Sequence, residues 1–239
     1  MIPIGDNVFF FARRKPVIVY LLIGIHLALF FWELKLELSG ELGTFVNTWG
    51  IVPAQISGAI AAGLSGNPAA WIVFLMRATA LLTGMFLHGS FSQILGNLIF
   101  LWVFGRTIES ILGYGRFLLL YLVSGFLTGL LQVLVEPSLT IPLIGANGAI
   151  AAILGAYALK FPQGKIDTIL PLLIIFIPIQ LPAFFYLFWW FVQQLSYSIG
   201  SLNIPGGVNP LSIGYWAHGA GIVIGAVFMK LLPHKRNGS

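Results

Sequence analysis

Residues 145–150 read GANGAI and open an apolar, alanine-rich stretch that continues to about Leu159 without a charged residue. Asn147 stands in the middle of this glycine-spaced hexamer. Polar side chains within a membrane are costly, and they face the interior of a helix bundle or a wet cavity. Small residues let a neighbouring helix or a ligand approach closely. The hexamer therefore predicts that something approaches the Asn147 side chain.

The composition of the chain indicates a membrane protein. Of the 239 residues, 58% are apolar and 8% are charged, whereas roughly 25% of the residues of an average soluble domain are charged. A soluble fold of this length cannot cover so much apolar surface, so we expect a lipid bilayer as the solvent. There is no cysteine, which excludes a disulfide framework and a thiolate nucleophile or ligand. We expect no metal and no cofactor.

The chain contains six stretches that suit a membrane-spanning helix of roughly 20 residues. They are Val17–Trp32, Phe86–Gly105, Phe117–Val135, Ile141–Leu159, Ala183–Ser198 and Leu211–Leu232. Residues 198–210, SIGSLNIPGGVNP, separate the last two because Gly, Asn and Pro favour turns. The segment Thr168–Leu181 contains Pro171 and Pro178, and we predict an interfacial or partly re-entrant connection there.

The positions of the basic residues support an even number of spans. With the N-terminus in the cytoplasm, only Lys35 and Arg77 of the 12 Lys and Arg residues lie outside, which is the asymmetry that the positive-inside rule describes. The net charge of +5 is scattered along the chain, so we expect no nucleic-acid partner.

We therefore predict an all-α polytopic membrane protein with a single domain, residues 1–239. Residues 1–16 form the cytoplasmic N-terminus, without the pattern of a removable signal peptide, and residues 233–239 form a cytoplasmic tail. Residues 33–85 form a long outer loop. Its apolar runs, such as AWIVFLM at 70–76, favour packing on or dipping into the outer leaflet.

Polar residues at membrane depth occur on three of the predicted spans. The second span carries His88, and also Gln93 and Asn97, which lie four residues apart and share a helix face. The last span contains GYWAHGAGIVIGA at 214–226, with His218 in its middle.

Small residues predict that the fourth and last spans touch. The residues that form a stripe with His218 on the last span are Gly214, Gly221 and Gly225; those of the fourth span are Gly148, Ala152 and Gly155. Such stripes permit close helix packing, which would place Asn147 and His218 at the polar end of the contact.

Each of these residues also has a structural interpretation. His26 is read as a packed histidine, and Gln93 and Asn97 as hydrogen-bonding links between helices, worth about 0.6–2 kcal/mol each. Glycine stripes are packing devices first. A shared cavity is favoured because all the polar side chains fall at the outer ends of their helices in the six-span topology.

At these residues the sequence resembles the rhomboid family of intramembrane serine proteases. The segment LLTGMFLHGSFSQILGNLIFLWVFGRTIESILGYGRFLLLYLVSG, residues 81–125, is similar to the family from its first outer loop through its third helix. Glu109 and Arg116 fall where the family has its acidic and basic turn residues. The resemblance implies six helices around a water-filled cavity that opens to the outside, in a bacterial plasma membrane.

The resemblance also implies residue roles. In the family, a serine at the head of the fourth helix attacks a peptide carbonyl and a histidine of the sixth helix accepts its proton. Carried over, His218 is the base and Asn147 occupies the position of the nucleophile. The positions implied for oxyanion and substrate binding are His88, Gln93, Asn97, Gly145 and Gly148.

Several positions depart from the family pattern. Asn147 replaces the serine, Gln93 stands where a histidine is usual, and Ala220 and Met76 replace a glycine and a tryptophan, whereas Arg77 beside Met76 is kept. We predict an inactive protease that binds transmembrane segments of membrane-protein clients. The alternative is an active rhomboid endopeptidase whose serine was replaced. A small transporter is disfavoured because neither internal repeats nor intramembrane charges occur. The sequence leaves the oligomeric state open.

Overall fold

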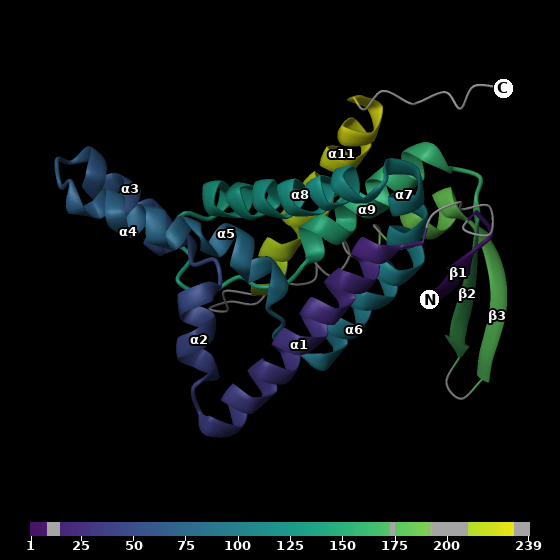
Figure 1. Ribbon diagram of the computed structural model, residues 1–239, viewed down its shortest axis with the longest axis horizontal. Helices are drawn as coiled ribbons and strands as arrows, with labels where there is room; N and C mark the ends of the chain where they lie inside the picture. The colour runs from purple at the N-terminus through teal and green to yellow at the C-terminus, as the bar shows by residue number, and fades with distance from the viewer. Residues whose placement is uncertain (9–14, 173–174, 191, 193–209, 232–239) are drawn as a thin grey trace.

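The chain folds into a bundle of helices with a three-stranded sheet along one side (Figure 1). The computed structural model describes residues 1–8, 15–172, 175–190, 192 and 210–231. The helices are α1 (Val17–Ser39), α2 (Leu42–Trp49), α3 (Pro53–Leu64), α4 (Ala69–Ala78), α5 (Ala80–Thr83), η2 (Gly84–Phe86), α6 (Phe91–Phe100), η3 (Leu101–Gly105), α7 (Arg106–Leu112), α8 (Tyr114–Val135), α9 (Asn147–Lys160) and α11 (Pro210–Leu231). Residues 183–190 are also helical. The predicted helical class is confirmed.

Within the described residues, four helical stretches are long and apolar enough to cross a membrane. They are Val17–Ser39, Ala69–Phe86, Phe91–Leu112 and Tyr114–Val135. The first, third and fourth coincide with the first three predicted spans, while α9 and α11 cover most of the fourth and sixth. The turn-forming residues 198–209 and the tail 233–239 lie outside the described residues. The count of six spans and the cytoplasmic termini stay predictions.

Both ends of α1 have a clear local cause. At its start, the buried carboxylate of Glu109 accepts hydrogen bonds from the backbone N–H groups of Ile18 and Val19, at 2.9 and 2.8 Å. These donors have no partner within the helix, so an anion stabilises them. At its end, Gly40 adopts φ 76°, a left-handed conformation that favours glycine. The helix continues past Trp32, and Glu33 lies within it.

The predicted outer loop is largely helical. Helices α3 and α4 form a hairpin that projects from the bundle (Figure 1). Gly63 permits their close packing, because a Cβ atom there would lie 2.6 Å from the Trp71 ring. Large apolar side chains of α4 stay exposed, among them Leu75 and Met76. This exposure supports contact of the hairpin with lipid.

The connection predicted at Thr168–Leu181 is made of β-strands, and its interfacial or re-entrant placement stays a prediction. Strands β2 (Lys165–Leu172) and β3 (Ile175–Pro182) form an antiparallel pair, and β1 (Ile2–Asp6) adds to β2 on the other side. The prolines explain the outcome. Pro171, Pro178 and Pro182 all occupy alternate pairs of the β2–β3 register, the class in which paired residues exchange no hydrogen bonds. A strand therefore tolerates prolines that would break a helix.

The sheet is attached to the helices through a buried hydrogen bond and through the apolar core. Asp6 of β1 is buried, and its carboxylate accepts a 2.7 Å hydrogen bond from the Thr107 hydroxyl of α7. Ile166 of β2 is fully buried in the apolar core, together with Phe104, Tyr121 and Tyr157. The core thus joins the sheet to α7, α8 and α9.

Candidate functional site

The chain turns sharply just before Asn147. Gly145 adopts φ 115°, and a Cβ atom there would run into the Gln93 side-chain amide. Glycine is therefore required both by the backbone conformation and by space. The backbone N–H of Gly145 donates to the carbonyl of Gly84 at 3.0 Å. Asn147 then begins α9 with a half-buried side chain.

The predicted contact between the fourth and last spans is confirmed. A Cβ atom on Gly225 of α11 would meet the backbone of Ala152, and one on Gly155 of α9 would meet the backbone of Ile222. At Gly221, the same atom would lie 2.5 Å from the Gly148 carbonyl oxygen. The two backbones are therefore as close as small residues permit. This packing brings the start of α9 beside His218.

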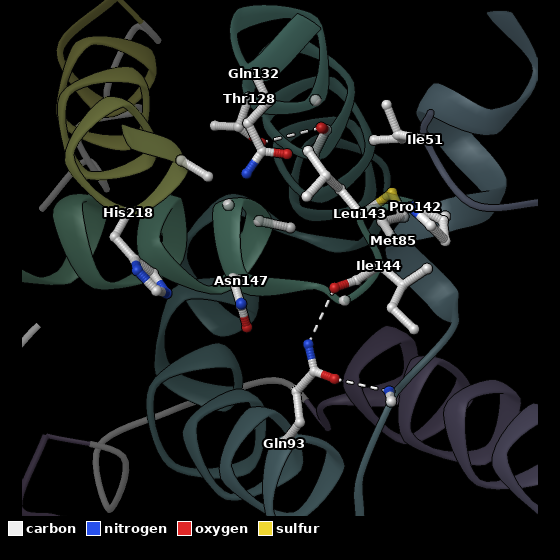
Figure 2. A pocket seen from close by; sticks show the side chains of 18 of the residues that line it. Ile51, Met85, Gln93, Thr128, Gln132, Pro142, Leu143, Ile144, Asn147 and His218 are labelled. Carbon is white, nitrogen blue, oxygen red and sulfur yellow. Dashed lines mark hydrogen bonds between the residues drawn. The ribbon is translucent and has the colours of Figure 1, made fainter. Parts of the chain in front are cut away.

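A pocket of about 680 Å³ opens at this junction. The predicted site residues that line it are Gln93, Gly145, Asn147, Gly148 and His218. Figure 2 shows the side chains of Asn147 and His218 projecting to the same side from α9 and α11. The His218 ring packs edge-on against Trp190, with 5.4 Å between the ring centroids.

The side-chain amide of Gln93 connects the loop before α6 to the segment before α9, and all of them line the pocket. Its Nε2 atom donates to the Ile144 carbonyl at 3.0 Å, and its Oε1 atom accepts from the Gly89 backbone N–H at 2.8 Å (Figure 2). Ser90 caps the start of α6, because its hydroxyl accepts from the Gln93 backbone N–H at 3.2 Å. Gln93 therefore positions the segment that leads into α9.

His88 and Asn97 do not line this pocket. Asn97 Nδ2 donates to His88 Nε2 at 3.1 Å, and both residues are buried. The Glu33 carboxylate of α1 accepts from the His88 backbone N–H at 3.1 and 3.2 Å. The His88 and His26 rings lie 5.1 Å apart, and His26 Nε2 lies 2.7 Å from the Tyr121 hydroxyl. The binding roles of His88 and Asn97 stay predictions.

Two pocket residues escape the sequence analysis. Thr128 and Gln132 lie one turn apart on α8, and both line the pocket. In Figure 2 they project from the side opposite Gln93, with Asn147 between them. Their spacing of four residues in a charge-free span is the signal that could have identified them.

The lining of the pocket offers several hydrogen-bonding groups. Within the described residues, its lining provides the hydroxyl groups of Ser90, Ser92 and Thr128 and no carboxylate. The Ser90 and Ser92 hydroxyls lie 3.1 Å apart and belong to the start of α6. Among the described residues there is no group of three or more His, Asp or Glu that could hold a metal ion.

This architecture defines a class of protein. It is a helical membrane protein with a polar pocket between the start of one helix and a histidine of another. Residues 76–235 match the Rhomboid domain. The chain belongs to the rhomboid family.

Several proteins share part of the sequence. Rhomboid protease GluP of Bacillus subtilis (strain 168) is 32% identical over 146 residues, which cover 61% of this chain and 25% of that protein. The mitochondrial presenilin-associated rhomboid-like protein of Homo sapiens is 31% identical over 107 residues, covering 44% and 27%. Mitochondrial Rhomboid protein 1 of Saccharomyces cerevisiae (strain ATCC 204508 / S288c) is 24% identical over 162 residues, covering 66% and 40%. The chain thus matches less than half the length of each of these relatives.

Proposed function

We propose that this rhomboid-family membrane protein is catalytically inactive and binds transmembrane segments of client membrane proteins. The observation that supports the proposal is the presence of Asn147, with no hydroxyl or thiol, beside His218 in a polar pocket. Charge asymmetry and the Bacillus relative favour a bacterial plasma membrane as its location.

Asn147 cannot replace the serine of a proteolytic rhomboid. The lone pair of its amide nitrogen is delocalised into the carbonyl group, and an imidazole is far too weak a base to deprotonate that nitrogen. Loss of the nucleophile from a Ser–His system lowers turnover by about 10⁴–10⁶-fold. The other hydroxyl groups of the described lining already have partners: Ser90 accepts at the start of α6, Ser92 pairs with Ser90, and Thr128 donates within α8.

Binding of a client segment requires space and hydrogen-bonding groups but no nucleophile, and the pocket offers both. Its volume of about 680 Å³ accommodates several residues of a partly unwound helix. Asn147, His218 and Gln132 supply hydrogen-bonding groups from three helices. In a bilayer, the unpaired backbone groups of an unwound segment need such partners. A client segment would thus exchange lipid for a polar pocket.

Photocrosslinking of single-pass reporters in nanodiscs tests the proposal. Wild-type protein is expected to capture a reporter that carries a photoreactive residue in its transmembrane segment. Asn147→Leu and His218→Leu are expected to lower the capture by at least about tenfold. Leu134→Ala is the matched control, because Leu134 is an exposed residue of α8 outside the pocket lining. Equal capture by all four proteins would contradict the proposal.

The alternative function is active intramembrane proteolysis by a protein whose native residue at this position is serine. The match to a named rhomboid protease favours it. Asn147→Ser separates the two functions, by labelling with a fluorophosphonate and by cleavage of a transmembrane reporter. We expect neither, because Gln93, Met76 and Ala220 also depart from the family pattern. Labelling together with cleavage would establish the protease.

A further inference from the structure

The wall of the pocket formed by α8 carries polar groups to which the family resemblance assigns no role. Thr128 and Gln132 are both buried, yet both line the pocket. The Thr128 hydroxyl donates within its own helix, to the carbonyl groups of Ser124 and Gly125 at 2.8 and 3.0 Å. It also lies against Gly148, where a Cβ atom would meet it. Thr128 is thus occupied by helix packing, whereas Gln132 is not.

Gln132 offers an unused carboxamide to the pocket. Gln132 is 9% exposed, and within the described part of the chain its side chain forms no hydrogen bond. Figure 2 shows this amide projecting toward the space beside Asn147. The Asn147 side chain, which also lines the pocket, likewise forms no hydrogen bond with the described residues. Two carboxamides from different helices therefore present free donors and acceptors to one space.

The surroundings select the kind of group that these amides can receive. The described residues of the lining include no Asp, Glu, Lys or Arg, and apolar side chains such as Met85 and Leu143 also line the pocket. An ionised side chain would lose its hydration there without gaining an opposite charge. An apolar side chain would leave both amides unpaired. A neutral group with both a donor and an acceptor satisfies them.

We propose that Gln132 and Asn147 form a subsite for a carboxamide side chain, Asn or Gln, carried by a client's transmembrane segment. The proposal rests on the client-binding function above and names the class of client. A carboxamide can donate to one pocket amide and accept from the other. In lipid the same side chain lacks partners. The polar residue of the client therefore drives its transfer from lipid into the pocket.

A reporter panel tests the subsite with the full-length protein. Single-pass reporters of one apolar background carry Gln, Asn, Leu or Glu at one outer-leaflet position, and the affinity of each is measured in nanodiscs. Wild-type protein is expected to bind the Gln and Asn reporters about tenfold more tightly than the Leu reporter, as one to two hydrogen bonds in a membrane imply. The Glu reporter is expected to bind no more tightly than the Leu reporter.

Variants then assign the preference to Gln132. Gln132→Leu and Gln132→Met keep much of the side-chain volume and are expected to bind all four reporters about equally. Leu134→Ala, on the same helix, is expected to retain the preference. Equal binding of the Gln and Leu reporters by wild-type protein would overturn the subsite but not client binding. A preference for the Gln reporter that survives in the Gln132 variants would have the same consequence. Binding of no reporter at all would overturn both proposals.

Discussion

The side-chain amide of Gln93 donates a 3.0 Å hydrogen bond to the backbone carbonyl of Ile144, three residues before Asn147. The other end of the same amide accepts from the Gly89 backbone N–H. One side chain of α6 therefore ties the loop before that helix to the segment that precedes α9. The resemblance implies an oxyanion donor at this position, and in this chain the Gln93 amide is bonded to the segment that leads into α9.

Gln93→Leu is expected to lower the free energy of unfolding by about 1–3 kcal/mol, because it leaves the Ile144 carbonyl and the Gly89 N–H without their partner. The measurement is reversible unfolding in mixed micelles. Gln163→Leu is the control, because Gln163 is exposed in the turn after α9, and a change below about 0.5 kcal/mol is expected for it. Equal stabilities of the two variants would show that the Gln93 amide positions nothing.

The glycine contact between α9 and α11 makes a second prediction. Gly225→Ala is expected to lower the free energy of unfolding by about 1–3 kcal/mol, because the new methyl group would meet the backbone of Ala152. Gly219→Ala, on the same helix, meets nothing within 4 Å and is expected to be neutral or slightly stabilising. Thermal unfolding of the two variants compares these effects. A neutral Gly225→Ala would mean that the helices are not in close contact there.

The parts of the fold that the sequence predicts correctly are those whose pattern lies within a single helix. Apolar length predicts α1, α6–α7 and α8, and the stripes that include Gly155 and Gly225 predict the α9–α11 contact. The sequence does not predict the β2–β3 hairpin, because Pro171 and Pro178 break a helix pattern, whereas their shared place in the strand register is visible only once the pairing is known.

The site was predicted less completely than the fold. Helical periodicity places Gln93 and Asn97 on one face of α6, but it does not say which neighbour meets that face. Gln93 contacts Ile144, whereas Asn97 contacts His88. The His88 backbone N–H in turn donates to Glu33 of α1. These partners come from distant segments of the chain. Local spacing therefore could not distinguish a pocket residue from a buried pair.

Glu109 provides a test of the start of α1. Glu109→Ala is expected to lower the free energy of unfolding by about 1.5–3 kcal/mol or more, because two buried backbone N–H groups lose a charged acceptor. Amide hydrogen exchange at Ile18 and Val19 is expected to accelerate. The control is Glu136→Ala, which removes an exposed carboxylate just after α8. Unchanged exchange in Glu109→Ala would contradict this assignment.

The Asn97–His88 pair separates stability from binding. Both residues are buried between α6 and α1 and neither lines the pocket, so Asn97→Ala should cost about 1–3 kcal/mol of stability by leaving His88 Nε2 without its donor. Capture of a transmembrane reporter by the folded protein is expected to change by less than about twofold. His218→Leu is expected to lower the capture of the reporter and to change the stability little, because the His218 ring lines the pocket. Loss of capture in Asn97→Ala at unchanged stability would instead assign Asn97 to client binding, the role that the family resemblance implies.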